Sequence, residues 1–183
     1  MLLRQFAVTL AGCLLASAQA GAQTSVTPSW LKTDPAARSV VVDVVAAFNE
    51  TNSNWNFNGY HTGDATLLIP TGWKIEVPFH NEEADVPHSL VVMADPGSED
   101  EFPSEVDTDA AAFHGAHSAS PVEGTSKGDA SDFSFTADKA GDYLWYCGVP
   151  GHGSAGMWIH FRVADDVAAP ELVLADDAEP GRE

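Results

Sequence analysis

Residues 143–158 read YLWYCGVPGHGSAGMW, an apolar stretch followed by a glycine-rich loop and a return to apolar residues. Three side chains in this stretch, Cys147, His152 and Met157, are ligands for soft metal ions, and four residues separate each from the next. A loop that closes between two strands with this spacing can bring a thiolate, an imidazole and a thioether to one point. Thiolate and imidazole ligands form a trigonal set for copper, and a weak axial thioether completes it. The set still lacks one imidazole.

The best candidate for the missing imidazole is His88, in the segment VPHSL at residues 86–90, where a strand is expected to begin. These soft donors suit copper cycling between Cu(I) and Cu(II) better than magnesium or calcium, although zinc also binds such a set. The alternative for Cys147 is a buried apolar thiol, and for Met157 it is core packing. Ser89, beside the ligand, either hydrogen-bonds near the thiolate or is an ordinary strand hydroxyl.

Two further histidines, His114 and His117, lie close together in an acidic stretch. They either form a second metal site or face solvent, and the sequence leaves both options open. His80 and His160 alternate with the core residues of their segments, which predicts that they lie at the surface.

Short segments with alternating or β-branched residues, separated by Gly, Pro and Asn, predict strands throughout the chain. No segment shows a helical stripe. The expected strands are residues 39–47, 56–60, 64–69, 73–81, 88–93, 131–136, 142–146 and 157–163. About seven or eight short strands of this kind predict an all-β fold, an antiparallel Greek-key β-sandwich.

The N-terminal residues 1–22 combine Arg4, an apolar run and small residues, which is typical of a secretory signal peptide cleaved near Ala20 or Ala22. An alternative is that Cys13, in the sequence LAGC, is lipidated and anchors the chain. Either reading predicts an exported protein in the periplasm or outside the cell. No later segment is long and apolar enough for a transmembrane helix in the mature chain.

The rest of the chain divides into four parts. Residues 23–38 are polar and predict a flexible spacer. The copper-binding domain is expected over 39–163, interrupted by an acidic insertion at 94–130 that predicts a surface loop with one helical turn near 109–113. Residues 164–183 predict an acidic, disordered tail.

The chain carries 27 acidic and 8 basic residues, a formal net charge of -19. Such a charge argues against nucleic acid as a partner. Seven of the acids fall between Asp95 and Asp109 with no base among them. The acidic surface reflects either solubility and salt adaptation or the steering of a basic redox partner. Because Cys13 lies in the leader, Cys147 is the lone cysteine of the mature chain, which has no disulfide.

Four segments carry a resemblance to the sulfocyanins, blue copper proteins of the cupredoxin superfamily related to rusticyanin. They are FNGY at 57–60, IPTGW at 69–73, VPHSL at 86–90, and CGVPGH at 147–152 followed by GMW at 156–158. The resemblance covers about 39–163. It implies a cupredoxin sandwich with one type 1 copper ion, in which His88, Cys147 and His152 are equatorial ligands and Met157 is axial. The acidic insertion and the cleavable leader depart from the family pattern.

The resemblance also implies an electron carrier, expected here to be a monomer that exchanges single electrons with respiratory partners such as a cytochrome or a terminal oxidase. Copper enzymes connect type 1 copper to a catalytic centre through histidines beside the cysteine. Here the neighbours are Tyr146 and Gly148, so the sequence predicts no enzyme. Copper storage or delivery is the alternative. The small residues around His152 favour its exposed ring edge as the electron port.

Overall fold

A computed structural model describes residues 24–176, 178 and 181–183. The predicted signal peptide and Cys13 lie outside the described residues. Within the described part, no helix is long and apolar enough to cross a membrane.

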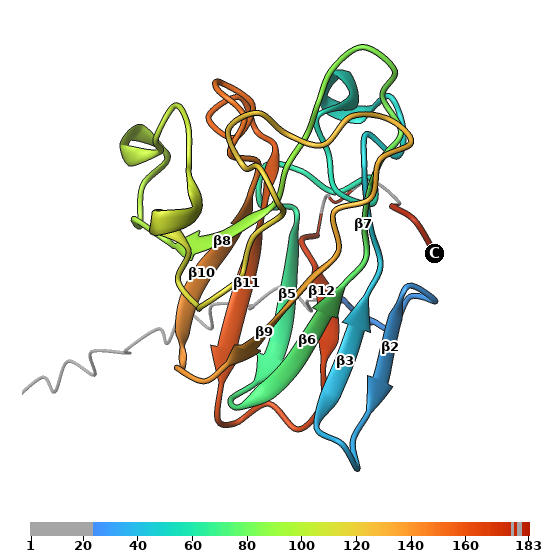
Figure 1. Ribbon diagram of the computed structural model, residues 1–183. Coiled ribbons are helices and arrows are strands. Elements are labelled where there is room, and N and C mark those ends of the chain that lie inside the picture. The colour runs from blue at the N-terminus through green and yellow to red at the C-terminus, as the bar shows by residue number, and fades with distance from the viewer. Residues whose placement is uncertain (1–23, 177, 179–180) are drawn as a thin grey trace, which may run out of the picture.

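The chain folds into two facing sheets (Figure 1). Six strands form the larger sheet in the order β1 (Thr24–Val26), β12 (Glu171–Leu174), β5 (Ala65–Pro70), β11 (Trp158–Ala164), β10 (Gly141–Tyr146) and β8 (Val91–Ala94). The second sheet has the order β2 (Leu31–Asp34), β3 (Ser39–Val42), β6 (Trp73–Val77) and β9 (Phe133–Ala137). The short pair β4 (Val44–Ala46) and β7 (Phe79–Asn81) follows β3 and β6 along the chain.

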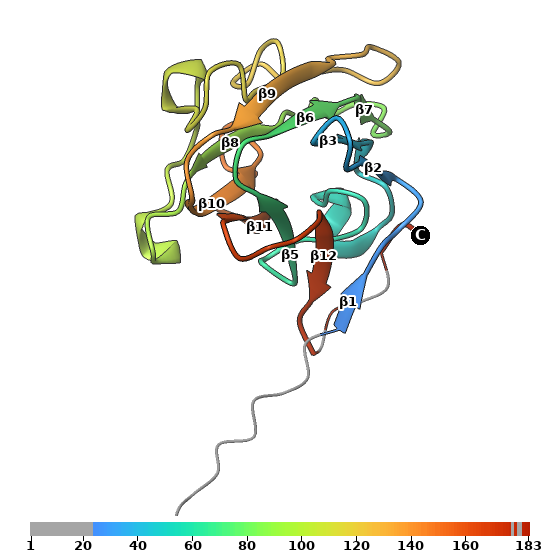
Figure 2. The same cartoon turned by 90° about the horizontal axis from the view of Figure 1, so that it is seen from below.

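The described residues contain no α-helix, and their helical turns are three short 3-10 helices, η1 (Thr51–Asn54), η2 (Glu99–Glu101) and η3 (Thr108–Ala110). The all-β prediction is therefore confirmed. Seen from below, the two sheets curve around a common core (Figure 2). Strand β6 illustrates how the sequence builds it, because Trp73, Ile75 and Val77 are buried while Lys74 and Glu76 are exposed.

Two details of the predicted topology were wrong. The sandwich is mixed, because β11 pairs with β5, β3 with β6, and β4 with β7 in parallel. Two expected strands are also each divided into two. Residues 73–81 divide at Pro78, which has no N–H to donate to a ladder, while its carbonyl accepts a hydrogen bond from Val44 N at 2.9 Å.

Residues 56–60 form a tight turn instead of the predicted strand. Phe57 and Tyr60 bond to each other through both backbone groups at 2.9 Å, across Asn58 and Gly59 in left-handed conformations. The buried Asn58 side chain accepts from Val45 N at 2.8 Å and donates to the Asp43 carbonyl at 3.0 Å. The turn is thereby fixed against the strand that precedes η1.

The predicted spacer and tail are both parts of the fold. Strand β1 pairs with β12, β12 pairs with β5, and β2 pairs with β3. Trp30 is only 4% exposed, and its Nε1 donates to the Arg182 carbonyl at 2.6 Å. Arg182 forms an ion pair with Asp43 at 2.9 Å. These strands have three or four residues, too few to show a period of two. The partners of β1 and β12 also lie far away in sequence, so alternation did not reveal them.

The acidic insertion is also more ordered than a surface loop. The predicted helical turn is present as η3, and the segment that follows it runs along the open edge of β8. Val92 N bonds the Ala116 carbonyl at 2.9 Å, and Ser118 N bonds the Leu90 carbonyl at 2.8 Å. Phe113 and Val106 are buried. The insertion therefore satisfies an edge strand that would otherwise be unpaired.

If the segment before residue 39 belongs to the core, Trp30→Ala should lower the free energy of unfolding by about 3–5 kcal/mol, as expected when a buried tryptophan is truncated. Lys32→Ala, at an exposed position of the adjoining strand, should change it by less than about 0.5 kcal/mol. Denaturant unfolding of both variants measures the difference. Equal stabilities would mean that Trp30 adds nothing to the core, as expected if residues 23–38 were a flexible spacer.

Candidate metal centre

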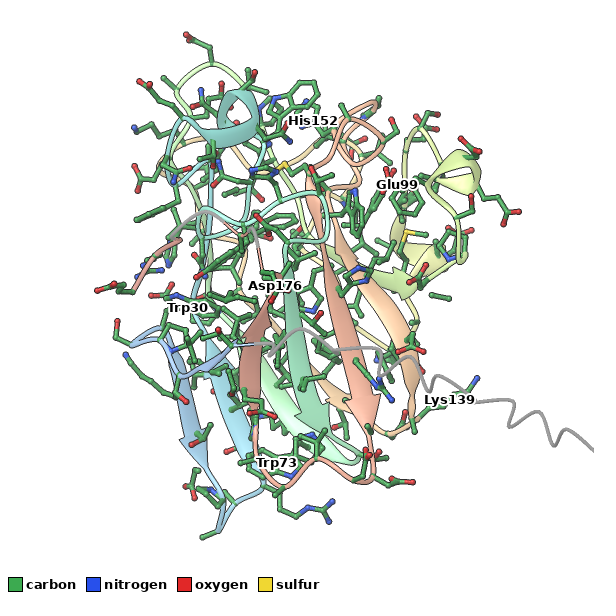
Figure 3. The ribbon with its side chains drawn as sticks, turned by 180° about the vertical axis from the view of Figure 1, so that it is seen from behind. Trp30, Trp73, Glu99, Lys139, His152 and Asp176 are labelled. Carbon is green, nitrogen blue, oxygen red and sulfur yellow. The ribbon has the colours of Figure 1, made fainter. Side chains whose placement is uncertain are left out.

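The segment that joins β10 to β11 closes as its spacing predicts. Residues 147–157 (the ligand loop) leave β10 after Tyr146 and enter β11 at Trp158, which are paired across the two strands. One step further along, Cys147 N donates to the Met157 carbonyl at 3.1 Å, and Met157 N donates to the His152 carbonyl at 3.0 Å. The loop gathers with η1 and the segment before β8 at one end of the sandwich (Figure 1), where Figure 3 labels His152.

His88 reaches the same place from the other side. It lies just before β8, where its backbone N–H and carbonyl bond the carbonyl and N–H of Thr125 at 3.2 and 2.7 Å. Its Nδ1 is 3.2 Å from His152 Nδ1, and His152 Nδ1 is 3.6 Å from Cys147 Sγ. One ligand atom from each of the three residues lies within 4.8 Å of the others. The structure thus brings together the thiol and both imidazoles predicted from the sequence.

Met157 is the fourth predicted residue, and it is completely buried. Its backbone hydrogen bonds to Cys147 and His152 place it beside the cluster. Its side chain is of the soft thioether type that the predicted set requires.

Burial controls the protonation of this cluster. Burial raises the pKa of the Cys147 thiol to about 11, and the backbone N–H groups of Ser89 and Val149 offset part of the rise. Burial, followed by repulsion from His88, lowers the pKa of His152 to about 4. Burial also lowers the pKa of His88, against the opposing effect of Glu83. At neutral pH both imidazoles are therefore free bases, and the thiol keeps its proton until a metal displaces it.

Ser89 lies against the sulfur. Its backbone N–H donates to Cys147 Sγ at 3.4 Å, and its hydroxyl oxygen lies 3.8 Å from the sulfur and accepts from Gly148 N at 2.9 Å. The structure thus favours the first of the two readings for Ser89, a residue that orients the thiolate. A donor to the sulfur also withdraws charge from it, which tunes a metal–thiolate bond.

The acidic insertion forms one wall of the site. Val106 N bonds the Gly148 carbonyl at 3.1 Å, and Gly151 N bonds the Ser104 carbonyl at 2.6 Å. A Cβ atom at Gly148 would lie 2.2 Å from the Val106 carbonyl oxygen. Only glycine fits between the sulfur-bearing residue and this wall.

Two residues near the site were missed by the sequence reasoning. Glu83 Oε2 lies 2.7 Å from His88 Nε2. The Trp55 ring stacks on the His152 ring with centroids 4.5 Å apart and planes at 23°. A lone tryptophan in the polar stretch 49–58 was a usable signal, whereas nothing in the sequence distinguishes Glu83 from its neighbours Glu82 and Asp85.

The remaining histidines stay outside the cluster. The side chains of His80 and His160 are 47% and 42% exposed, in agreement with their predicted surface positions. His114 is exposed, and His117 Nδ1 bonds the Ser118 carbonyl at 2.9 Å. Across residues 24–176, 178 and 181–183, the group of His88, Cys147 and His152 is the one set of three such ligands close enough to share an ion.

A buried thiol with two free-base imidazoles fits copper in both oxidation states, and Met157, a thioether residue, is buried and hydrogen-bonded through its backbone to two residues of this group. Comparison with known proteins agrees with this chemistry. A sequence model of the sulfocyanin (SoxE) domain matches residues 27–174. The chain belongs to the sulfocyanin family. The match extends beyond both ends of the expected domain, to include β2 and β12.

Among curated proteins, sulfocyanin from Sulfolobus acidocaldarius is 30% identical over 140 residues, covering 75% of this chain and 69% of that protein. Solved structures with a similar backbone include auracyanin A, a blue copper protein from Chloroflexus aurantiacus. It is 19% identical, with a TM-score of 0.48, and the match covers 69% of this chain and 99% of that one. Rusticyanin from Thiobacillus ferrooxidans is 20% identical, with a TM-score of 0.42 over 74% of this chain and 86% of that one.

As a sulfocyanin, the chain is an electron-transfer protein with one type 1 copper ion and not an enzyme. It therefore exchanges electrons with redox partners.

Proposed function

We propose that His88, Cys147 and His152 bind copper as equatorial ligands with Met157 as the axial ligand, and that the protein carries single electrons between respiratory partners outside the cytoplasm. The observation that carries this proposal is the convergence of Cys147 Sγ with one ring nitrogen of each histidine, all within 4.8 Å of one another in a buried site. When bound, copper supplies a one-electron Cu(I)/Cu(II) couple.

The protein's own contribution is a site that needs little rearrangement when its charge changes. Cys147, His152 and Met157 are linked to one another through the backbone, and His88 is held by Thr125. All four side chains are buried, which keeps bulk water from the metal. A rigid, dry set of ligands lowers the reorganisation that each electron transfer requires.

Copper added to the metal-free protein should give an intense thiolate-to-copper band in the visible spectrum and a reversible one-electron wave in voltammetry. Cys147→Ser should lose the band, because a serine oxygen does not replace a soft thiolate. His114→Ala, outside the cluster, is the matched control and should keep both signals. A colourless, redox-silent wild-type protein would contradict the proposal.

The proposed location of the protein depends on its N-terminal signal peptide. A signal peptide over residues 1–22 would export the mature chain to the periplasm or the cell exterior, with lipidation of Cys13 as the route to a membrane surface. There the protein would act as a monomer, with a cytochrome or a terminal oxidase as partner.

Copper storage or delivery remains the alternative function. Proteins of that class favour exposed sites with exchangeable metal and several methionines or histidines. Only Met93 and Met157 follow the start residue, and the four proposed ligands are buried. Their burial favours electron transfer, in which the metal stays in place.

The acidic surface supports a cationic partner. The acids of η2 and of the segment up to η3 are exposed in the insertion whose backbone bonds the ligand loop. They are Glu99, Asp100, Glu101, Glu105, Asp107 and Asp109. A field of one sign next to the metal centre accelerates encounter with a partner of the opposite sign.

The rate of electron transfer with a cationic cytochrome c should therefore fall steeply between low and physiological ionic strength, where the screening length shortens to about 8 Å. Stopped-flow kinetics over a salt series measures the slope. The anion ferricyanide, used as a control oxidant, should show the opposite trend. A flat response with the cytochrome would assign the acids to solubility or salt adaptation.

A further inference from the structure

Trp55 lies over the residue that the sequence suggested as the exposed electron port. His152 is only 7% exposed, so little of its ring edge can reach solvent. The partly exposed Trp55 ring stacks on it with centroids 4.5 Å apart. The indole is therefore the side chain that links the buried imidazole to solvent on this face.

The segment that presents Trp55 has a specified shape. Asn52, Ser53 and Asn54 have φ values of 47°, 58° and 72°, a left-handed run that is unfavourable for residues with a Cβ. It is held by Asn52 Nδ2, which donates to the Trp55 carbonyl at 3.0 Å and to the Ala155 carbonyl of the ligand loop at 3.3 Å. Strain of this kind persists where the surrounding structure fixes it, and often at functional sites.

The two segments that meet at this ring carry acidic side chains of their own and no basic ones, and Lys127 from the insertion pairs with Glu82 at 3.4 Å. The segment 47–55 carries Glu50, and the adjacent segment 82–87 carries Glu82, Glu83 and Asp85, with no Lys or Arg in either. Contact between the two segments is direct, because Asn54 Nδ2 donates to Glu83 Oε1 at 3.3 Å. An aromatic ring beside segments in which acids exceed bases favours a protein whose docking surface is basic.

We propose that Trp55 is the docking contact through which electrons pass between the metal held by His152 and a redox protein with a cationic surface. This rests on the proposed function. In the reducing direction, the partner's reduced centre loses one electron and Cu(II) becomes Cu(I), with no proton moved. The indole stays in its closed-shell state and provides the orbital contact across the stack.

Removal of the ring gives opposite results for the two possible ports. If Trp55 is the port, Trp55→Leu should slow electron transfer with cationic cytochrome c by about tenfold, equivalent to about 1.4 kcal/mol in the barrier. If the His152 edge is the port, the smaller side chain should uncover it and raise the rate. Trp55→Phe, which retains a stacking ring, should restore most of the wild-type rate.

Phe48→Leu is the matched control, because Phe48 is 41% exposed in the same segment and should leave the rate unchanged. The copper band and the reduction potential of each variant are measured first, so loss of the metal centre is separated from loss of the port. In a second measurement, the metal-free protein is titrated with cytochrome c, and the Trp55 indole resonance should shift more than that of buried Trp73. An unchanged or faster Trp55→Leu, or an indole that does not respond, would overturn the proposal.

An independent observation concerns Glu83. A carboxylate only accepts hydrogen bonds, so the 2.7 Å contact between Glu83 Oε2 and His88 Nε2 requires the proton of the neutral ring to be on Nε2. That leaves the lone pair on Nδ1, the atom that lies 3.2 Å from His152 Nδ1 in the cluster. The carboxylate thus selects the tautomer that a metal needs.

Glu83 is itself held in place. Its Oε1 accepts from Asn54, and its backbone N–H donates to Asn81 Oδ1 at 2.8 Å. Its side chain is 18% exposed, whereas that of Glu82 is 57% exposed and faces Lys127. Among the acids of this segment, Glu83 is the one in contact with a predicted ligand.

We infer that Glu83 is a positioning residue that fixes the orientation of His88 and, through its negative charge, stabilises the oxidised metal over the reduced metal. Glu83→Gln retains an oxygen acceptor but removes the charge. The affinity for Cu(II) should fall by about tenfold or more. If the affinity for Cu(I) stays the same, each tenfold fall in the affinity for Cu(II) raises the reduction potential by about 59 mV.

Glu83→Leu removes both the charge and the acceptor. In the metal-free protein, nitrogen NMR should then show His88 with a mixture of tautomers, whereas the wild type and Glu83→Gln should hold the proton on Nε2. Glu82→Gln, one residue away with no contact to His88, is the control and should match the wild type in potential and tautomer. If Glu83→Gln and Glu82→Gln have the same potential, or Glu83→Leu retains the wild-type tautomer, the inference fails.

Discussion

The metal centre depends on the pairing of β10 with β11. Their ladder runs from Gly141 with Val163 to Tyr146 with Trp158, and the hydrogen bond from Cys147 to Met157 extends it by one step. Because strand pairing fixes register, the positions of the thiol and the thioether follow from the sheet. The nine residues between Cys147 and Met157 form a loop whose two ends lie side by side, which places His152 close to Cys147 and Met157. A shift in the register of these strands would therefore separate the thiol from the thioether and also move core side chains to the other face of the sheet.

The parts of the structure that could be predicted are those with a local signal. Cys147, His152 and Met157 share one short loop, and alternation in residues 73–77 revealed a half-buried strand. The parts that escaped prediction depend on distant contacts. Trp30 is buried because it meets Arg182 from the other end of the chain, and Glu83 matters because a turn brings it back to His88. The prediction of His88 depended on its position at the start of an expected strand and on the resemblance of its segment to a known family, since its distance from Cys147 along the chain carries no periodic signal.

The polar residues buried at the site are satisfied within the protein itself. His88, Ser89 and His152 are buried and hydrogen-bonded, so desolvation of each is compensated. Burial raises the pKa of Cys147 and lowers the pKa of His152, and both shifts favour the uncharged form of the side chain in a dry interior. The metal charge enters a site whose surrounding dipoles are already oriented.

The acidic insertion combines two properties in one segment. Its exposed side chains supply much of the negative charge, while its backbone bonds the open edge of β8 and the ligand loop. Substitution at the exposed acids leaves the backbone contacts in place, whereas deletion would expose the edge of β8 beside the proposed ligand His88. The segment is therefore free to vary in charge and constrained in length. Proteins of this design could adapt to a more or less salty surrounding, or to a different partner, by point substitution within a loop whose size stays the same.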